Sequence, residues 1–251
     1  MQDPSRVAAL VPGELRLRTL RLGADAERAF LGNTGTLDPH FLRHFTGAGL
    51  LDRFGRALAE RSAVRVKEWL EACEFFGRVR RRVRAPVVAD IAASHGLVGA
   101  LYALFERSVA EVRWIDRSVP ESRAAVLAAA VEVAPWAAAK LRADDGWLAE
   151  RGAALPAGAA LVAVHACGAL TDDVLALAIA RGGPVAVLPC CRPHGRSPAP
   201  AAVARALGGD TGFDVDRTYR LERAGYTVRW DAISAAITPM NRVIAAWPTR
   251  E

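Results

Sequence analysis

Residues 87–99 read Val-Val-Ala-Asp-Ile-Ala-Ala-Ser-His-Gly-Leu-Val-Gly, and this stretch decides the fold. It begins with a short apolar run, Val87–Ile91, that has the length and composition of a buried strand. Small residues and a glycine follow, and a segment of helical length then runs from Leu97 to Arg107. A strand, a tight turn and a helix in this order form one βα step, the unit from which parallel sheets are built.

The same step recurs along the chain. Short apolar runs alternate with longer segments of helical spacing, which is typical of a parallel sheet whose strands are joined by crossover helices. The third run is the least regular, because its alanines fit a helix as well as a strand. The further predicted strands are Glu111–Asp116, Ala139–Ala143, Leu161–His165 and Val185–Cys190.

The pattern changes after the fifth step. Residues 192–212 are predicted to form a loop with a short helix, and Asp214–Ala224 a longer helix. Two strands follow, Tyr226–Ser234 and Arg242–Trp247, and they must run antiparallel because only a turn joins them. The sequence therefore predicts an α/β fold with a doubly wound, Rossmann-like sheet of seven strands that ends in an antiparallel hairpin.

The chain before the first strand has another character. Residues 1 to about 38 mix Gly, Pro, Arg and Leu and are predicted to form an irregular or partly helical arm. Residues 39–82 carry apolar side chains at helical spacing and are predicted to form a helical lead-in that packs across the later domain. We therefore divide the chain into the arm with its lead-in, residues 1–84, and a ligand-binding domain, residues 85–251.

Composition bounds the class of protein. A hydrophobic content of 52% in 251 residues allows a full core, while no apolar run reaches the roughly 20 residues of a membrane span. The chain lacks a secretion signal at its start, so we expect it in the cytoplasm. The net charge of +6 favours phosphate-rich partners but does not establish nucleic-acid binding. The four cysteines form no recognised disulfide framework and are expected to be reduced.

The predicted strand ends carry acids. In an open α/β sheet, ligands bind outside the carboxyl ends of the strands. Asp90 ends the first strand, and Asp116, 26 residues later, ends the second, where a carboxylate accepts both hydroxyls of a ribose. Asp144 and Asp145 follow the third strand, and one of them is a candidate to bind an adenine amino group. The alternative for all of these acids is a solvated loop or a helix cap.

The loop after Asp90 resembles the first motif of class I methyltransferases, an acidic residue followed by alternating glycines. Asp90, Ala92, Ser94 and Gly96 are in register with that motif, and His95 lies within it. Ala92 and Ser94 replace two glycines, which keeps the side chains small but loses the freedom to adopt positive φ. Ser94, Gly96 and Gly99 also fit a nicotinamide-type fingerprint that lacks its first glycine, and an ordinary tight βα turn is a third interpretation.

Two further segments carry potential chemistry. His165-Ala-Cys167-Gly-Ala-Leu-Thr171-Asp172 ends the fourth strand, and Cys190-Cys191-Arg-Pro-His194 ends the fifth. If the fourth and fifth strands are neighbours, about 4.8 Å apart, their ends meet. His165, Cys167, His194 and one of the adjacent cysteines would then line one pocket, while strand alternation would send the other cysteine to the opposite face.

These segments resemble a branch of class I methyltransferases in which the fourth strand reads H-x-C-G-x-x-T-D and the fifth ends in a Cys-Cys pair. The branch includes relatives of methyltransferase-like protein 25 and the tRNA 2′-O-methyltransferases that act on the acceptor stem. The resemblance covers Val87 to Trp247. It implies a class I methyltransferase fold and the cofactor S-adenosylmethionine, bound by the domain of residues 85–251. It suggests an RNA acceptor, and a small-molecule acceptor is the alternative.

Methyl transfer to a hydroxyl or a protonated amine needs a general base. His165 is the candidate, because its unperturbed pKa lies near the working pH; its alternative role is to orient the following loop. We also count His165 among the cofactor-binding candidates. Asp172 opens a helix, where capping is the default role, and it is kept as a candidate for substrate contact.

Cys167, Cys190 and His194 are kept as acceptor-side candidates, although buried cysteines more often serve as small apolar groups. We assign no metal site; a site built from His165, Cys167, one strand-five cysteine and His194 is an alternative with suitable ligands but no recognised spacing. Two other functions stay open: a nicotinamide-dependent oxidoreductase, and a non-catalytic module that binds a metal or a cofactor.

Overall fold

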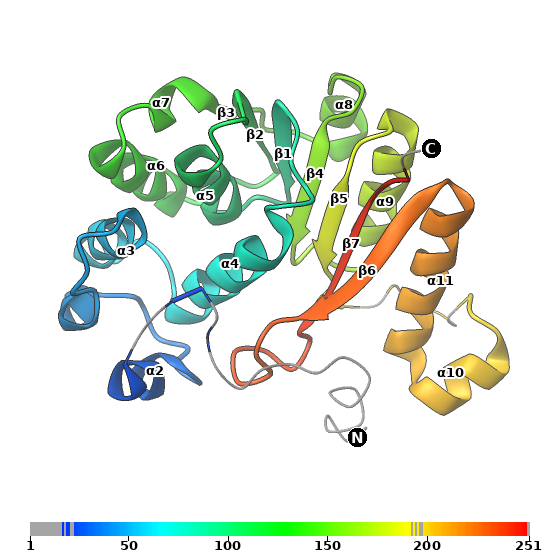
Figure 1. Cartoon of the computed structure of the whole chain (residues 1–251), viewed down its shortest axis with the longest axis horizontal. Coiled ribbons are helices and arrows are strands. Elements are labelled where there is room, and N and C mark those ends of the chain that lie inside the picture. The colour runs from blue at the N-terminus through cyan, green and yellow to red at the C-terminus, as the bar shows by residue number, and fades with distance from the viewer. Residues whose placement is uncertain are drawn as a thin grey trace.

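The structure is a computed structural model, and it describes residues 17, 19–20, 23–191, 193, 195 and 198–249. A twisted sheet runs through the centre of the molecule with helices on both faces (Figure 1). The strands are β1 (Val87–Ile91), β2 (Glu111–Ile115), β3 (Leu141–Ala143), β4 (Ala160–Val164), β5 (Val185–Leu188), β6 (Tyr226–Ala232) and β7 (Arg242–Pro248). The helices before the sheet are α2 (Ala24–Phe30), the 3-10 helix η1 (Pro39–His44), α3 (Leu50–Glu60) and α4 (Val66–Val79). Those that follow are α5 (Leu97–Phe105), α6 (Ser122–Val133), α7 (Ala137–Lys140), α8 (Leu148–Ala153), α9 (Leu170–Arg181), α10 (Ala201–Leu207) and α11 (Gly209–Arg223).

The strand order is β3-β2-β1-β4-β5-β7-β6. Strands β1 to β5 are parallel to one another, whereas β7 is antiparallel to both β5 and β6. This arrangement confirms the predicted fold class, a doubly wound, Rossmann-like sheet of seven strands with an antiparallel terminal hairpin. The order reverses between β1 and β4, and this switch point is where open α/β sheets bind ligands.

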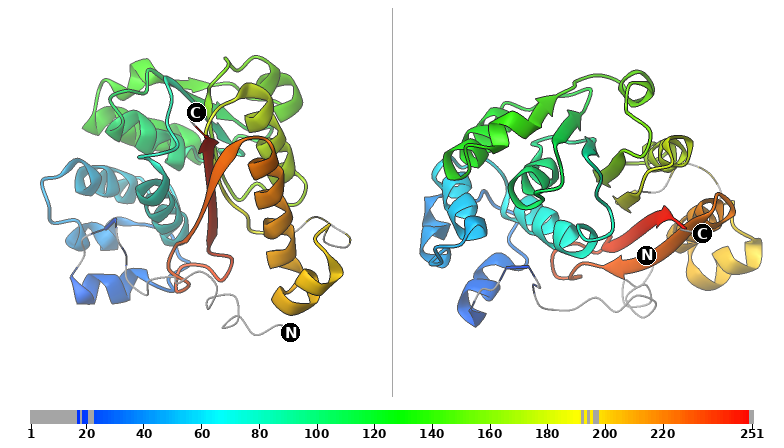
Figure 2. Two further views of the ribbon diagram at one scale, coloured as in Figure 1. Left: turned by 45° about the vertical axis from the view of Figure 1, so that its right-hand side comes forward. Right: turned by 45° about the horizontal axis from the view of Figure 1, so that its top comes forward.

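Alternate residues of each strand supply two hydrophobic cores. Ala160 and Val162 of β4 face a core shared with α3 to α7, while Leu161 and Ala163 face a core shared with α9 and α11. Figure 2 shows the resulting three layers, with the sheet between the two groups of helices. Because each fully buried Val or Leu contributes about 1.5–3 kcal/mol, this two-faced burial holds the strand ends in fixed positions.

The N-terminal helices share the first of these cores. Helix α4 packs against α5, and α3 packs against α6. Trp69 of α4 is fully buried between the rings of Phe45 and Phe54. The predicted helical lead-in across the later domain is therefore present, and it brings α4 to the carboxyl ends of β1 and β4. In the part of the chain that the structure describes, no helix is long and apolar enough to cross a membrane; the cytoplasmic location stays a prediction.

Several predicted strand ends were wrong. Strand β4 ends at Val164, because His165 adopts a positive φ of 65° that leaves the strand conformation. Strand β5 ends at Leu188, because Pro189 has no N–H to continue the ladder. Strand β6 ends at Ala232 rather than Ser234.

The alanine-rich third strand was also predicted too long. Its first part, Ala137–Lys140, is the short helix α7, in agreement with the helical alternative for these alanines. Helix α11 was predicted too short, since it begins at Gly209 rather than at Asp214.

Candidate functional site

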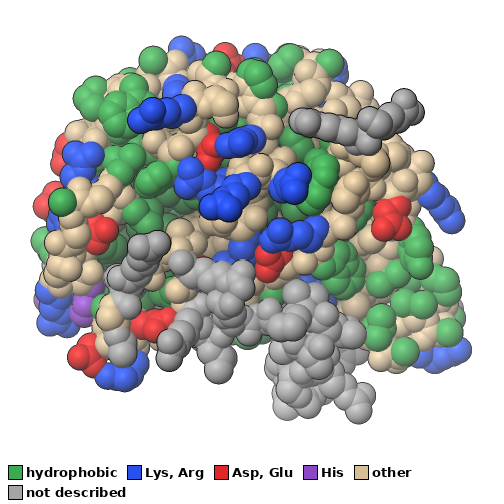
Figure 3. Space-filling view, in the orientation of Figure 1, with side chains coloured by type: hydrophobic (Ala, Val, Ile, Leu, Met, Phe, Trp, Pro, Cys, Tyr) green, Lys and Arg blue, Asp and Glu red, His purple; other side chains and the backbone are tan. Residues whose placement is uncertain are grey.

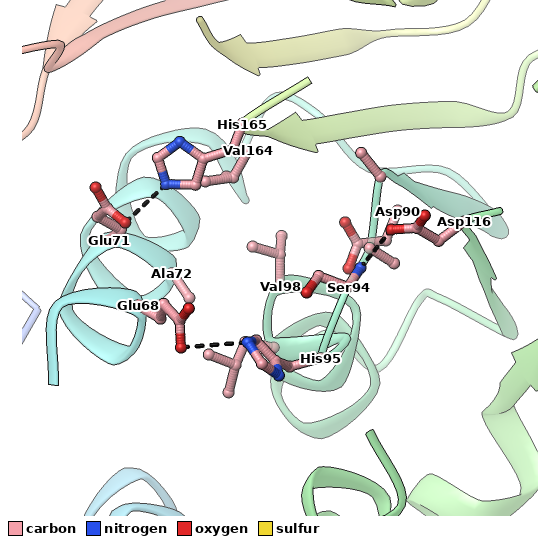
Figure 4. Close-up of a pocket in the computed structure, with 13 residues that line it drawn as sticks. Glu68, Glu71, Ala72, Asp90, Ser94, His95, Val98, Asp116, Val164 and His165 are labelled. Atoms are coloured by element: carbon pink, nitrogen blue, oxygen red, sulfur yellow. Dashed lines mark hydrogen bonds and ion pairs between the residues drawn. The ribbon is translucent and has the colours of Figure 1, made fainter. Parts of the chain in front are cut away.

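A cavity of about 370 Å³ lies at the switch point of the sheet, within the size range of small-molecule sites. Figure 4 shows its two sides: Asp90, Asp116 and the loop after β1 lie on one, and Glu68 and Glu71 of α4, each paired with a histidine from another element, lie on the other. The cavity is lined by Glu68, Glu71, Ala72, Asp90, Ala92, Ala93, Ser94, His95, Leu97, Val98, Asp116, Val164 and His165. Six of the residues singled out in the sequence are thus brought together: Asp90, Ala92, Ser94, His95, Asp116 and His165.

The loop after β1 has the backbone conformation of a glycine-rich loop, although only one of its three key positions is a glycine. Ala92, Ser94 and Gly96 all have positive φ, at 55°, 47° and 78°. These are the three positions at which the methyltransferase motif has small residues. Gly96 is the N-cap residue of α5, and a side chain there would collide with the indole of Trp114. The loop therefore turns sharply enough to expose its backbone to the cavity, at a cost of roughly 1–2 kcal/mol for each non-glycine residue.

The variant Ser94→Gly is expected to be more stable than the wild type by about 1 kcal/mol. Glycine adopts positive φ without strain, which stabilises the folded state. Its greater conformational entropy in the unfolded chain offsets only part of that stabilisation. Ala93→Gly is the matched control: Ala93 lies outside the positive-φ positions, so glycine there is expected to destabilise the protein. Urea unfolding of both variants measures the difference. Equal destabilisation by the two substitutions would show that the loop is not strained at Ser94.

Asp90 is the buried acid of the cavity. Its side chain lies at the end of β1, where Oδ2 accepts a hydrogen bond of 2.8 Å from the backbone N–H of Gly99. Burial raises the pKa of Asp90 to about 7, although this hydrogen bond and the charge of Arg123 oppose the rise. Asp90 is therefore poised to change its charge near neutral pH, and a cationic ligand group in the cavity would favour the ionised form.

Asp116 holds the loop and faces the cavity. Its Oδ2 accepts the backbone N–H of Ser94 at 2.8 Å, and its Oδ1 accepts that of Ser118 at 3.0 Å. Each carboxylate oxygen has two lone pairs, so both keep acceptor capacity for a ligand. Asp116 is half-buried and lies one strand away from Asp90. Its contact with ribose hydroxyls stays a prediction.

Helix α4 contributes two acid–histidine pairs that the sequence did not identify. Glu71, only 1% exposed, lies 2.7 Å from Nε2 of His165 through its Oε2. Glu68 lies 3.2 Å from Nε2 of His95. Burial acts to raise the pKa of Glu68, but the hydrogen bonds from His95 and the backbone of Arg65 outweigh it and lower the pKa. The only sign of these pairs in the sequence is that Glu68 and Glu71 lie three residues apart in an otherwise apolar helix. That spacing does not indicate which side of the helix faces the sheet.

The His165 pair has the geometry of an oriented base. Because Glu71 accepts from Nε2, the proton of a neutral imidazole lies on that nitrogen and Nδ1 carries the free lone pair. Among the described residues, Nδ1 has no hydrogen-bond partner. The ring is also partly exposed, at 36% of the side chain. His165 can therefore accept a proton at Nδ1 while the buried carboxylate stabilises the resulting charge.

The acids after β3 have other contacts. Asp145 forms an ion pair with Arg123, whose Nε also donates to the backbone oxygen of Ser94 at 2.7 Å. Asp144 lies 3.6 Å from Arg151 and 3.8 Å from Arg113. Neither carboxylate is among the cavity-lining groups. Their predicted adenine contact stays a prediction, whereas Asp145 supports the site through Arg123.

The described acceptor-side candidates other than His165 do not line the cavity. Cys167 and Cys190 lie together, but neither lines the cavity. Asp172 is held by Arg217 and Arg220 from α11, and these ion pairs lower its pKa although burial acts to raise it. His194 lies outside the described residues.

The prediction that strand alternation separates the two adjacent cysteines was wrong. β5 ends before them, so the alternation of a strand does not apply to Cys190 and Cys191, and both lie in one cluster with Cys167. The physical reason is the early end of the strand at Pro189.

The arginine-rich turn between α4 and β1 lies away from the cavity. It precedes β1, so it sits at the amino ends of the strands, whereas the cavity is at their carboxyl ends. Arg80 and Arg84 pair with the buried carboxylate of Glu106, and Arg82 stacks on Trp247. Through these contacts, Arg80, Arg82 and Arg84 brace the turn and do not line the cavity. Figure 3, in the orientation of Figure 1, shows Lys and Arg side chains gathered across the middle of the molecular face that is turned toward the viewer.

Comparison with known proteins gives structural similarity alone. No protein-family model matches the sequence, and neither does any curated protein. Solved structures that are similar include the tRNA methyltransferase TrmK from B. subtilis, with 14% identity over 70% of this chain and 66% of that chain, at a TM-score of 0.44. An O-methyltransferase family protein from Burkholderia thailandensis has 12% identity over 78% and 62%, at 0.43. The S-adenosylmethionine-dependent methyltransferase SibL has 16% identity over 90% and 68%, at 0.46.

The matched region spans about two thirds or less of TrmK and of the Burkholderia protein. Proteins this distant differ in function even where the fold is shared, so the function is inferred from the site.

Proposed function

We propose that this protein transfers a methyl group from S-adenosylmethionine to an oxygen or nitrogen acceptor. The observation that carries the proposal is the pair of acids at adjacent strand ends, Asp90 on β1 and Asp116 after β2, facing one cavity beside a loop with three positive-φ residues. An open α/β sheet places a nucleoside ligand at this point of the topology.

The cavity residues fit the cofactor in charge and polarity. Asp116 offers the free lone pairs that the two ribose hydroxyls require. Asp90 is a buried acid with one oxygen committed to Gly99, and an ammonium group is the partner that favours its ionised form. Leu97, Val98 and Val164 supply apolar lining for the remainder of the ligand. The cofactor, when bound, supplies an electrophilic methyl group on a positively charged sulfur.

His165 serves as the general base of this proposal. It accepts the proton of the acceptor at Nδ1, while Glu71 fixes the ring through Nε2 and stabilises the imidazolium that forms. A positioned base of this kind contributes roughly 10²–10⁴-fold in rate. The acceptor is a hydroxyl or an amine of RNA or of a small molecule. The arginine-rich turn lies at the opposite end of the strands and does not favour RNA over a small molecule.

Cofactor binding is the property that tests the proposal. Calorimetric titration with S-adenosylhomocysteine is expected to give a micromolar Kd for the wild type. The Asp116→Ala variant is expected to bind at least tenfold more weakly, because a hydrogen bond to a charged group contributes about 1.5–3 kcal/mol. Asp173→Ala, which removes an exposed acid in the first turn of α9, is the matched control and should bind like the wild type.

A parallel titration with NADH separates the alternatives. NADH binding without S-adenosylhomocysteine binding would replace the proposal with a nicotinamide-dependent oxidoreductase. Binding of neither ligand by the folded protein would contradict the proposal as well. If S-adenosylhomocysteine binds, radiolabelled S-adenosylmethionine with total RNA and with a metabolite extract identifies the acceptor class.

A further inference from the structure

Three thiols gather beside the cavity, at the ends of β4 and β5. The Sγ atoms of Cys167 and Cys190 are 2.8 Å apart, and with Cys191 the three sulfurs lie within 4.8 Å of one another. Cys167 and Cys191 are exposed and Cys190 is half-buried. Three cysteines from two separate loops thus present their sulfurs to one point at the surface.

The backbone fixes both loops that carry these thiols. Strands β4 and β5 pair in parallel up to Val164 and Leu188, and the N–H of His165 continues the pairing with a bond of 3.3 Å to the oxygen of Leu188. The hydroxyl of Thr171, which is fully buried, closes the Cys167 turn by donating to the backbone oxygen of Ala166. The cluster is therefore built into the sheet ends and does not depend on a chance approach of two mobile loops.

The three thiols make contact with one another. Within the described part of the chain, they form hydrogen bonds only to one another. A thiophilic cation would bind the three sulfurs as thiolates and replace their protons.

We infer that Cys167, Cys190 and Cys191 form a binding site for a thiophilic metal ion, with Zn²⁺ as the fitting ion. Tetrahedral zinc with Zn–S bonds of about 2.3 Å places its sulfurs about 3.8 Å apart, so this cluster closes around the ion after shifts of about 1 Å. Binding forms three metal–sulfur bonds and releases three protons to solvent. The exposed side of the cluster leaves the fourth position open to water or to a ligand.

The site differs from the four-ligand arrangement considered from the sequence. His165 has its Nε2 committed to Glu71, and the two adjacent cysteines both join Cys167. The cavity acids Asp90 and Asp116 take no part in it. Metal binding and cofactor binding are therefore separate properties that succeed or fail independently.

Metal titration of the reduced, full-length protein tests the inference. After chelator treatment, Co²⁺ is added to record thiolate-to-cobalt absorption, and Zn²⁺ affinity is measured by competition with a chromophoric chelator. We expect one equivalent of either ion per chain. Each of Cys167→Ser, Cys190→Ser and Cys191→Ser should weaken Zn²⁺ binding at least 100-fold, whereas Cys73→Ala, at the buried cysteine of α4, should bind like the wild type.

Other results would overturn the inference. Wild-type protein that binds Zn²⁺ no more tightly than the Cys167→Ser variant has no such site. A Cys167–Cys190 disulfide that resists reduction, seen as a loss of two hydrogens in the intact mass, would show that the cluster is a redox pair instead. S-adenosylhomocysteine binding is measured on the same variants, and it should be retained in all of them whether or not the metal binds.

Discussion

Replacing Asp90 with asparagine is expected to stabilise the folded protein at pH 8 by about 4 kcal/mol, while weakening the proposed cofactor binding. Burial raises the folded-state pKa of Asp90 to about 7 from its ordinary value of 3.8. Between these two values the folded chain holds a proton that the unfolded chain has released, so stability falls as pH rises. At 1.36 kcal/mol per pKa unit, the full loss is about 4 kcal/mol above pH 7.

Asparagine has no charge to bury and can still accept the Gly99 N–H through its side-chain oxygen. The gain from Asp90→Asn is therefore expected to be largest at pH 8 and less than half as large at pH 5, where most of the wild-type Asp90 is already protonated. Urea unfolding at the two pH values measures it, with the exposed Asp173→Asn as control. A gain that does not change with pH would show that Asp90 ionises like an ordinary carboxyl.

Cofactor affinity is expected to rise with pH, whereas the stability of the folded protein falls. Because the ionised acid is the partner of an ammonium group, S-adenosylhomocysteine should bind more tightly as pH rises through 7 in the wild type, and weakly at every pH in the Asp90→Asn variant. Calorimetry over this range checks the slope. A stabilised variant that still binds would separate the buried charge from the proposed function.

The second large effect is expected at Asp214 in α11. Its carboxylate is 2% exposed and accepts from Nη1 of Arg217 at 2.9 Å and from Nε of Arg242 at 2.7 Å. Asp214→Ala leaves the buried guanidinium of Arg242 without a carboxylate, and breaking a buried pair in this way costs about 3–5 kcal/mol. Thermal and urea unfolding give the value.

Asp216 provides the comparison on the same helix. It pairs with Arg220 at 2.9 Å, but both side chains are partly exposed. Asp216→Ala is therefore expected to cost no more than about 1 kcal/mol. Similar losses for the two alanine variants would show that the Asp214 pairs are solvated and contribute little.

The elements of this fold could be predicted because their signals are local. The apolar run before Asp90 and the turn between Tyr226–Ala232 and Arg242–Pro248 each determine their own structure. The acids at the strand ends followed from the strand positions, and Asp90 and Asp116 both line the cavity.

What could not be predicted depends on contacts between distant segments. Glu71 meets His165 across 94 positions of sequence, and only the docking of α4 creates that pair. The cysteine cluster depends on where β5 ends. Strand β5 ends two residues before the predicted Cys190, because Pro189 has no N–H with which to continue the ladder.

Helix α4 has a consequence for how the site is assembled. Its two glutamates come from the segment before residue 85, and the loop and strand ends come from the segment after it. A chain shortened to begin at Val87 would keep every strand of the sheet and lose one wall of the cavity, together with the carboxylate that orients His165. The boundary at residue 84 thus divides the sequence but not the site, because the cavity is complete only when α4 is docked against the strand ends.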